Sequence, residues 1–191
     1  MIITALATLL IGQGAAAVVC PMTAEASPAT GKAIDYNGVR YTMCCGGCDG
    51  AFKKDPAAAL KNEKLKGKLV GVSLFDPVSG ARIEEKNAKG GSADFNGVRY
   101  YFANADEKKE FDAEPKKFAT APKKDALFCA VMGHEVKDYA SAGGYVNVGD
   151  TRYYVCCGDC LEAMKKDPAG MAAKAKNVKA PGALDAPVKK G

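Results

Sequence analysis

One short segment recurs three times along the chain, and this internal similarity limits the possible folds more than any other feature. The copies are residues 34–41 (IDYNGVRY), residues 93–100 (ADFNGVRY) and, with one insertion, residues 145–153 (YVNVGDTRY). Apolar and polar residues alternate around a central Asn-Gly pair, which predicts a two-stranded hairpin whose turn residues take positive φ. A repeat at a regular spacing predicts a chain built from tandem units.

Each copy is followed by the same helix signals. An acidic residue and a proline recur at Asp55-Pro56, Glu114-Pro115 and Asp167-Pro168. Aspartate caps a helix well, and proline is tolerated at the first helical position because its missing N–H has no partner there. We therefore predict an α+β fold of three small tandem repeats, each a β-hairpin with a short helix packed on it, similar in size to a zinc finger. The predicted repeats are residues 18–65, 72–121 and 126–176, called the first, second and third unit below.

The two ends of the chain have different compositions. Residues 2–11 are an uncharged apolar run, too short to span a bilayer, and an Ala-x-Ala pattern follows them. This predicts a signal peptide over residues 1–17, cleaved near Ala17, and hence a periplasmic or secreted protein with no membrane span in the mature chain. Because no Lys or Arg precedes the run, the alternatives are a true start that lies upstream and a run that forms a buried strand. Residues 177–191 are rich in Ala, Pro, Lys and Gly, which predicts a disordered tail.

All eight cysteines fall into two matching sets. The sets are Cys20, Cys44, Cys45 and Cys48, and Cys129, Cys156, Cys157 and Cys160. If a strand ends at Cys44 and a helix begins at Cys48, both sulfur atoms face one point, and Cys20 supplies a third from a neighbouring strand. A helix N-terminus also lowers the pKa of a thiol. We predict metal sites at Cys20, Cys44 and Cys48 and, by repeat equivalence, at Cys129, Cys156 and Cys160.

The ligand sets leave some residues open. Neighbouring side chains at a strand end point in opposite directions, so Cys45 and Cys157 are either fourth ligands or free thiols. His134, the single histidine, is either a nitrogen ligand of the second site or a solvated side chain. Thiolates suit Zn²⁺ and Cu(I), and a supply of four cysteines favours the tetrahedral Zn²⁺ site. Units this small usually need a metal, a disulfide or a partner to fold, so we expect the metal to supply folding energy.

The cysteine pattern resembles a known family. Cys20-Pro21-Met22-Thr23, the Asn-Gly hairpin, the run from Cys44 to Cys48, and Phe52 with Asp55-Pro56 are similar to the YHS/TRASH-like metal-binding domain family, across all three repeats. The resemblance implies thiolate metal binding in heavy-metal handling or sensing, a metal-transport or metal-resistance protein as partner, and no catalytic activity.

The middle repeat departs from this pattern. Asp76, Ala103 and Glu107 stand where the other repeats have cysteine. This repeat resembles the cysteine-free branch of the same family and is expected to lack a soft-metal site. Two carboxylates offer few ligands for a hard cation, so we expect Asp76 and Glu107 to be solvated.

Other function classes receive less support. The Cys-x-x-Cys spacing within each set is also found in thiol–disulfide exchange proteins, and four cysteines per unit would suit a disulfide-stabilised interaction module. The net charge is +5, but the lysines are mixed with acidic residues, which argues against nucleic-acid binding. No phosphate loop or catalytic motif favours an enzyme. We predict an exported, non-enzymatic protein with one soft metal ion in each of two sites.

Overall fold

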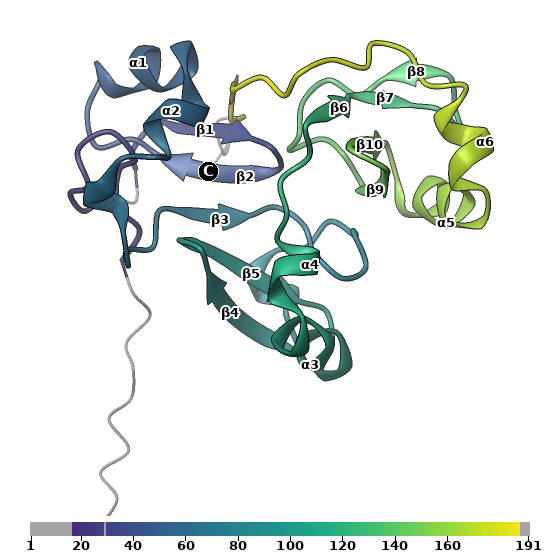
Figure 1. Cartoon of the computed structure of the whole chain (residues 1–191), viewed down its shortest axis with the longest axis horizontal. Coiled ribbons are helices and arrows are strands. Elements are labelled where there is room, and N and C mark those ends of the chain that lie inside the picture. The colour runs from purple at the N-terminus through teal and green to yellow at the C-terminus, as the bar shows by residue number, and fades with distance from the viewer. Residues whose placement is uncertain (1–16, 29, 188–191) are drawn as a thin grey trace, which may run out of the picture.

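The computed structural model describes residues 17–28 and 30–187 and confirms an α+β fold (Figure 1). Most of the predicted signal peptide lies outside the described residues. The strands are β1 (Ala33–Tyr36), β2 (Val39–Thr42), β3 (Gly71–Ser73), β4 (Gly91–Phe95), β5 (Val98–Phe102), β6 (Lys124–Ala126), β7 (Phe128–Cys129), β8 (His134–Glu135), β9 (Gly144–Val148), β10 (Thr151–Val155) and β11 (Leu184–Asp185). They form a six-stranded sheet in the order β11-β1-β2-β3-β5-β4, a three-stranded sheet in the order β6-β10-β9, and the pair β7-β8.

The helices follow the hairpins in pairs. They are α1 (Cys48–Lys54), α2 (Pro56–Ala59), α3 (Ala105–Ala113), α4 (Pro115–Phe118), α5 (Gly158–Lys166) and α6 (Pro168–Ala172), with 3₁₀ turns η1 (Glu63–Leu65) and η2 (Glu85–Asn87). As predicted, the side chain of Asp55 caps α2 by accepting a hydrogen bond from the Ala58 amide. None of the described helices is long and apolar enough to cross a membrane.

The three predicted hairpins are present as β1–β2, β4–β5 and β9–β10, all antiparallel. In the first turn Asn37 has φ 54° and Gly38 has φ 76°, and in the second Asn96 has φ 50° and Gly97 has φ 77°. Positive φ at both central residues defines the tight turn that matches strand twist. The sequence pattern therefore specifies these hairpins locally.

The units are joined to one another through β3. This strand lies between β2 and β5, antiparallel to the first and parallel to the second, so the hairpins of the first two units share one sheet. Directly after β3, Leu74 and Phe75 enter the core of the third unit, where the Phe75 ring lies 5.4 Å from that of Tyr145. β3 and the buried residues Leu74 and Phe75 that follow it thus connect all three units.

Two of the three hairpins carry the same cross-strand ion pair. Arg40 lies opposite Asp35, and Arg99 lies opposite Asp94. In both pairs the guanidinium donates two hydrogen bonds of 2.8 Å to the carboxylate. Each arginine is thereby held within its own hairpin.

The third hairpin has an asparagine where the others have the aspartate. Arg152 donates to Asn147 Oδ1 at 3.0 Å and also reaches two backbone oxygens outside its hairpin, Asn37 O at 3.1 Å and Thr120 O at 3.4 Å. An amide accepts only one of the guanidinium hydrogen bonds, so the remaining N–H groups are available to other units. Arg152 is 6% exposed and links the third unit to the turn of the first and the end of the second.

The prediction of a disordered tail was wrong for the described part of residues 177–191. β11 pairs with β1 at the edge of the six-stranded sheet, and the Asn177 side chain donates to Glu135 Oε1 at 2.7 Å. Figure 1 shows this segment crossing from α6 back to the first unit. An unpaired sheet edge provides backbone partners for almost any sequence, and composition does not reveal such pairing.

Candidate metal centre

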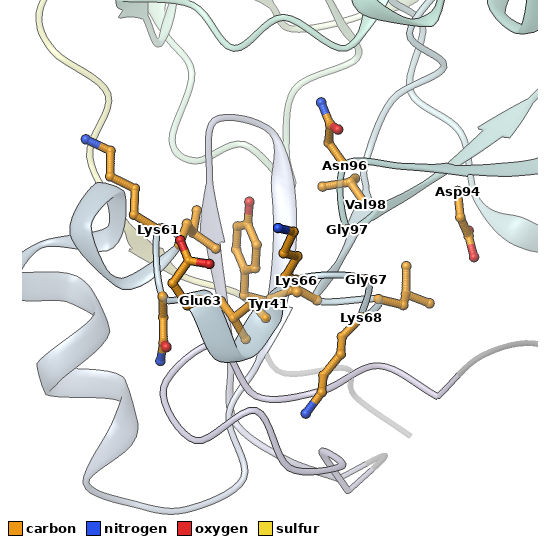
Figure 2. A pocket seen from close by; sticks show the side chains of 15 residues that line it. Tyr41, Lys61, Glu63, Lys66, Gly67, Lys68, Asp94, Asn96, Gly97 and Val98 are labelled. Atoms are coloured by element: carbon orange, nitrogen blue, oxygen red, sulfur yellow. The ribbon is translucent and has the colours of Figure 1, made fainter.

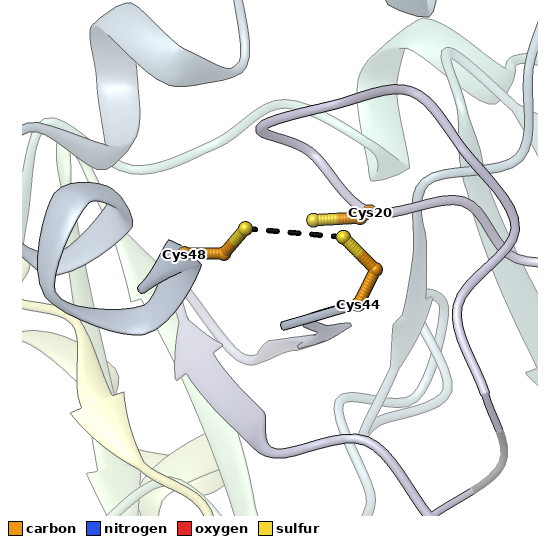
Figure 3. Close-up of side chains that lie close together, drawn as sticks. All are labelled: Cys20, Cys44 and Cys48. Atoms are coloured by element: carbon orange, nitrogen blue, oxygen red, sulfur yellow. Dashed lines mark hydrogen bonds between the residues drawn. The ribbon is translucent and has the colours of Figure 1, made fainter. Parts of the chain in front are cut away.

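The structure brings Cys20, Cys44 and Cys48 together in the first unit. Cys20 comes from the turn before the hairpin, Cys44 follows β2, and Cys48 begins α1; Figure 3 shows their sulfur atoms facing a common space. The three sulfur atoms lie within 4.8 Å of one another, and Cys44 Sγ is 3.8 Å from Cys48 Sγ. Zn–S bonds of about 2.3 Å in a tetrahedral site put sulfur atoms about 3.8 Å apart. The spacing therefore suits one soft metal ion.

The third unit repeats this arrangement with Cys129, Cys156 and Cys160. Their sulfur atoms also lie within 4.8 Å of one another, and Cys156 Sγ is 3.6 Å from both of the others. In both clusters the first and last cysteines are buried and the middle one is half-buried. We call these two sets the first and third thiol clusters.

A glycine before each hairpin lets the chain approach the turn that carries the thiols. A Cβ atom on Gly143 would lie 2.4 Å from Cys157 Cα, and one on Gly31 would lie 2.4 Å from Met43 O. Such distances are too short for any side chain to fit without backbone movement. The position of the thiol turn thus depends on the absence of a side chain at these glycines.

The first cysteine of each cluster lies where backbone amides stabilise an anion. Burial raises the pKa of Cys20, but hydrogen bonds from the amides of Cys44, Met22 and Thr23 outweigh it and lower the pKa to about 7. Burial also raises the pKa of Cys129, and amide hydrogen bonds again lower it below the usual range. Amides directed at a sulfur atom favour its charged form, which is the form that binds metal.

The last cysteine of each cluster behaves differently in the metal-free chain. A hydrogen bond with Cys45, together with burial, raises the pKa of Cys48, and burial together with the neighbouring thiols raises that of Cys160. The prediction that a helix start lowers these pKa values was wrong. Several thiolates repel one another at this distance, and a bound cation reverses that effect.

The structure places the remaining candidates outside the two clusters. Cys45 and Cys157 are exposed, and Cys45 Sγ lies 2.6 Å from Cys48 Sγ, too close for both to bind one ion in this arrangement. His134 is exposed, and its Nδ1 lies 2.9 Å from Glu135 O. Each cluster therefore holds three thiols. The preference for Zn²⁺ over Cu(I) depended on four cysteine ligands per site, so this arrangement does not support it.

The second unit holds a carboxylate at the position of the first cysteine. Asp76 is fully buried, so the prediction of a solvated side chain was wrong. Its Oδ1 accepts from the amides of Val78 at 2.9 Å and Ser79 at 3.3 Å, and its Oδ2 accepts from the Ala103 amide at 2.9 Å. These amides occupy the same positions in the repeat as the three that bond Cys20. All three units thus have a backbone site for an anion, which the residue types alone did not indicate.

Glu107 stands at the position of the last cysteine. Burial and the neighbouring Asp76 raise its pKa, and its Oε2 is buried without a hydrogen-bond partner. A proton on one of two adjacent carboxyl groups relieves their repulsion. The second unit therefore keeps the backbone of a thiol cluster while its side chains favour a proton.

A groove between the first and second units has no sequence signal at all. It has a volume of about 710 Å³, and its lining includes Tyr41, Lys61, Lys66 and Gly97 (Figure 2). No cysteine lines it, so it is separate from both thiol clusters. Its walls come from segments that meet only in the folded chain.

Comparison with known proteins finds no matching family model, no matching curated protein and no matching solved structure.

Proposed function

We propose that this chain is a non-enzymatic metal-binding protein that holds one soft metal ion in each of the two thiol clusters. The convergence of three sulfur atoms in both clusters supports this proposal most directly. A disulfide uses cysteines in pairs and gives no reason for a third sulfur to face the same point. Three sulfur atoms around a common space are what a thiolate-bound ion requires.

The ion is Zn²⁺ or Cu(I). Three thiolates complete the coordination of Cu(I), whereas Zn²⁺ also requires a fourth ligand, either water or a rearranged Cys45 or Cys157. Both cations favour the thiolate state, for which Cys20 and Cys129 are already prepared by backbone amides. Metal binding then releases protons from those thiols that are still protonated.

The biological setting of the proposal comes from the sequence. The apolar N-terminal run and Ala-x-Ala pattern support export to the periplasm or beyond, and the similarity to YHS/TRASH-like domains supports a role in heavy-metal handling or sensing. A metal-transport or metal-resistance protein is the partner that this role implies. Periplasmic thiol–disulfide exchange through the Cys-x-x-Cys motifs is the second candidate, favoured by the contact between Cys45 and Cys48.

Metal counting tests the main proposal. The full chain, reduced and supplied separately with Zn²⁺ and with Cu(I), is expected to bind two equivalents by elemental analysis after gel filtration, and competition between the ions identifies the preferred one. Cys44→Ser combined with Cys48→Ser is expected to remove one equivalent. Cys45→Ser combined with Cys157→Ser is the matched control and is expected to keep both. A folded wild-type chain that retains neither ion, or a ligand variant that still holds two equivalents, would rule the proposal out.

A further inference from the structure

The contact between the sulfur atoms of Cys45 and Cys48 is unusually short. They are 2.6 Å apart, whereas Cys44 Sγ lies 3.8 Å from Cys48 Sγ, and Cys156 Sγ lies 3.6 Å from the sulfur atoms of Cys129 and Cys160. A disulfide bond is about 2.05 Å long, so a small movement would join this pair. Cys45 is exposed and accessible to a reagent, while Cys48 is buried within the first thiol cluster.

We propose that Cys45 and Cys48 form a reversible disulfide that removes Cys48 from the first thiol cluster and releases its metal ion, while the third thiol cluster keeps its own. The release step rests on the proposed function, because it requires a metal on Cys20, Cys44 and Cys48. The disulfide itself does not depend on metal and can be tested in the metal-free chain.

The backbone explains why the two units differ. In the first unit the Cys48 amide donates to Cys45 O at 3.3 Å, and the helix begins only at Cys48, so the two cysteines close a turn before it. In the third unit the helix begins earlier, at Gly158, and Cys157 is its extended N-cap with φ −153° and ψ 172°. The sulfur atoms of Cys129 and Cys160 each lie 3.6 Å from Cys156 Sγ in that unit.

The reaction is an exchange with a low-molecular-weight disulfide. The Cys45 thiolate attacks one sulfur of the reagent, forms a mixed disulfide and expels the first thiolate. The Cys48 sulfur then attacks Cys45 Sγ, closes the protein disulfide and expels the second thiolate. Two electrons pass from the two cysteine sulfurs to the reagent, which leaves as two thiols. Their protons come from the Cys45 and Cys48 thiols or, when the Cys48–metal bond is broken instead, from water.

The third unit should stop at the first step. Cys157 is exposed and can form the mixed disulfide, but it is the extended N-cap of α5 and lacks the turn that brings the sulfur atoms of Cys45 and Cys48 to 2.6 Å. Because Cys157 is outside the third thiol cluster, a mixed disulfide there leaves three thiolates on the ion. Oxidation therefore distinguishes the two metal sites although their ligand sets are alike.

The experiment treats the Zn²⁺-loaded full chain with glutathione disulfide and follows Zn²⁺ release with a chromogenic chelator. Trypsin then yields residues 41–53 from the first unit and residues 153–165 from the third, each with three cysteines, which mass spectrometry distinguishes after alkylation of free thiols. We expect an internal disulfide in residues 41–53, a glutathione adduct in residues 153–165, and release of one of the two bound equivalents. Cys45→Ser should abolish that release, and Cys157→Ser should leave it unchanged.

Three results would overturn the inference: simultaneous loss of both equivalents, release from the Cys45→Ser variant at the wild-type rate, or no internal disulfide in the metal-free chain. If no internal disulfide forms in the metal-free chain but two equivalents of metal still bind, this inference fails and the proposed function stands. If the disulfide forms but the reduced chain binds no metal, the release step fails together with the proposed function. Addition of reductant and Zn²⁺ to the oxidised chain should restore the second equivalent.

Discussion

The second unit offers a direct test of what makes a thiol cluster in this fold. It has the same hairpin and helix as the other units and the same amide donors, but carries Asp76, Ala103 and Glu107 at the thiol positions. If the backbone positions the ligands, the combined substitutions Asp76→Cys, Ala103→Cys and Glu107→Cys should create a third metal site. We expect the bound metal to rise from two equivalents per chain to three.

The energetic consequences follow from the contacts of Asp76. Without metal, replacement of the carboxylate weakens three amide hydrogen bonds at a buried position, at a cost of about 1–3 kcal/mol. Metal at a hundredfold excess over its dissociation constant restores about 2.7 kcal/mol. The triple variant should therefore be less stable than wild type without metal and nearly as stable with it. The core around Phe102 and Phe111 is unchanged, so the variant should still fold.

Elemental analysis measures the third equivalent, and urea unfolding with and without metal measures its effect on stability. The control variant carries Asp76→Cys and Glu107→Cys but keeps Ala103, so it has only two thiols and is expected to stay at two equivalents. A triple variant that is folded by circular dichroism and yet binds two equivalents would refute the reasoning. Backbone equivalence would then not be sufficient to position a ligand set.

Three further changes test individual contacts. Arg152→Lys keeps the charge but loses about two of three hydrogen bonds, so the free energy of unfolding in urea should fall by about 2–3 kcal/mol. The matched control Arg99→Lys alters one partly exposed ion pair and should lower the free energy of unfolding by less than about 1 kcal/mol. Equal losses in the two variants would contradict the linking role of Arg152. The pKa of Glu107 is raised in the folded chain, so its carboxyl group contributes stability to the folded state in its protonated form. This contribution is fully present below about pH 4 and is lost as the pH rises through the raised pKa. Glu107→Gln should therefore raise stability by roughly 1 kcal/mol near about pH 8 and hardly at all near about pH 4, and equal thermal shifts at both pH values would contradict this. Gly143→Ala should displace the turn that carries Cys156 and Cys157, weaken metal binding by the third thiol cluster and lower the free energy of unfolding by about 1–3 kcal/mol. Gly158→Ala should be tolerated, because no atom outside its own helix and chain neighbours lies within 4 Å of the added Cβ. Equal metal affinities of the two variants in a titration would show that the close approach at Gly143 does not matter.

The sequence predicted those parts of the fold that a few neighbouring residues determine. Asn37-Gly38 specifies its turn through positive φ, and Asp55-Pro56 specifies a capped helix start. The thiol clusters follow from the same local rules, because the end of the hairpin and the start of the helix fix the separation of Cys44 and Cys48. Cys45 stayed ambiguous since its position depends on the residue at which the helix begins.

Features that depend on distant partners were not predictable in this way. β3 has three residues and no pattern of its own, yet it joins two hairpins because edges of two strands are available on either side. The hydrogen bonds of buried Asp76 depend on one amide 27 residues away, that of Ala103, as well as on its own turn. Arg152 links the units because the repeat has Asn147 where the other hairpins have an aspartate. The guanidinium N–H groups that this change leaves available find partners only because backbone oxygens of other units lie nearby.

The joined architecture changes what the metal has to do. Isolated units of this size usually need a metal, a disulfide or a partner to fold, but here β3 gives the first two hairpins a common sheet and Phe75 lies in the core of the third unit. The second unit also forms its hairpin and helix with the carboxyl groups of Asp76 and Glu107 in place of two thiols. Each unit has its own hydrophobic core and is also joined to its neighbours, so a bound ion is not the only source of folding energy. The proposed release of metal from the first thiol cluster by oxidation is therefore compatible with an intact fold.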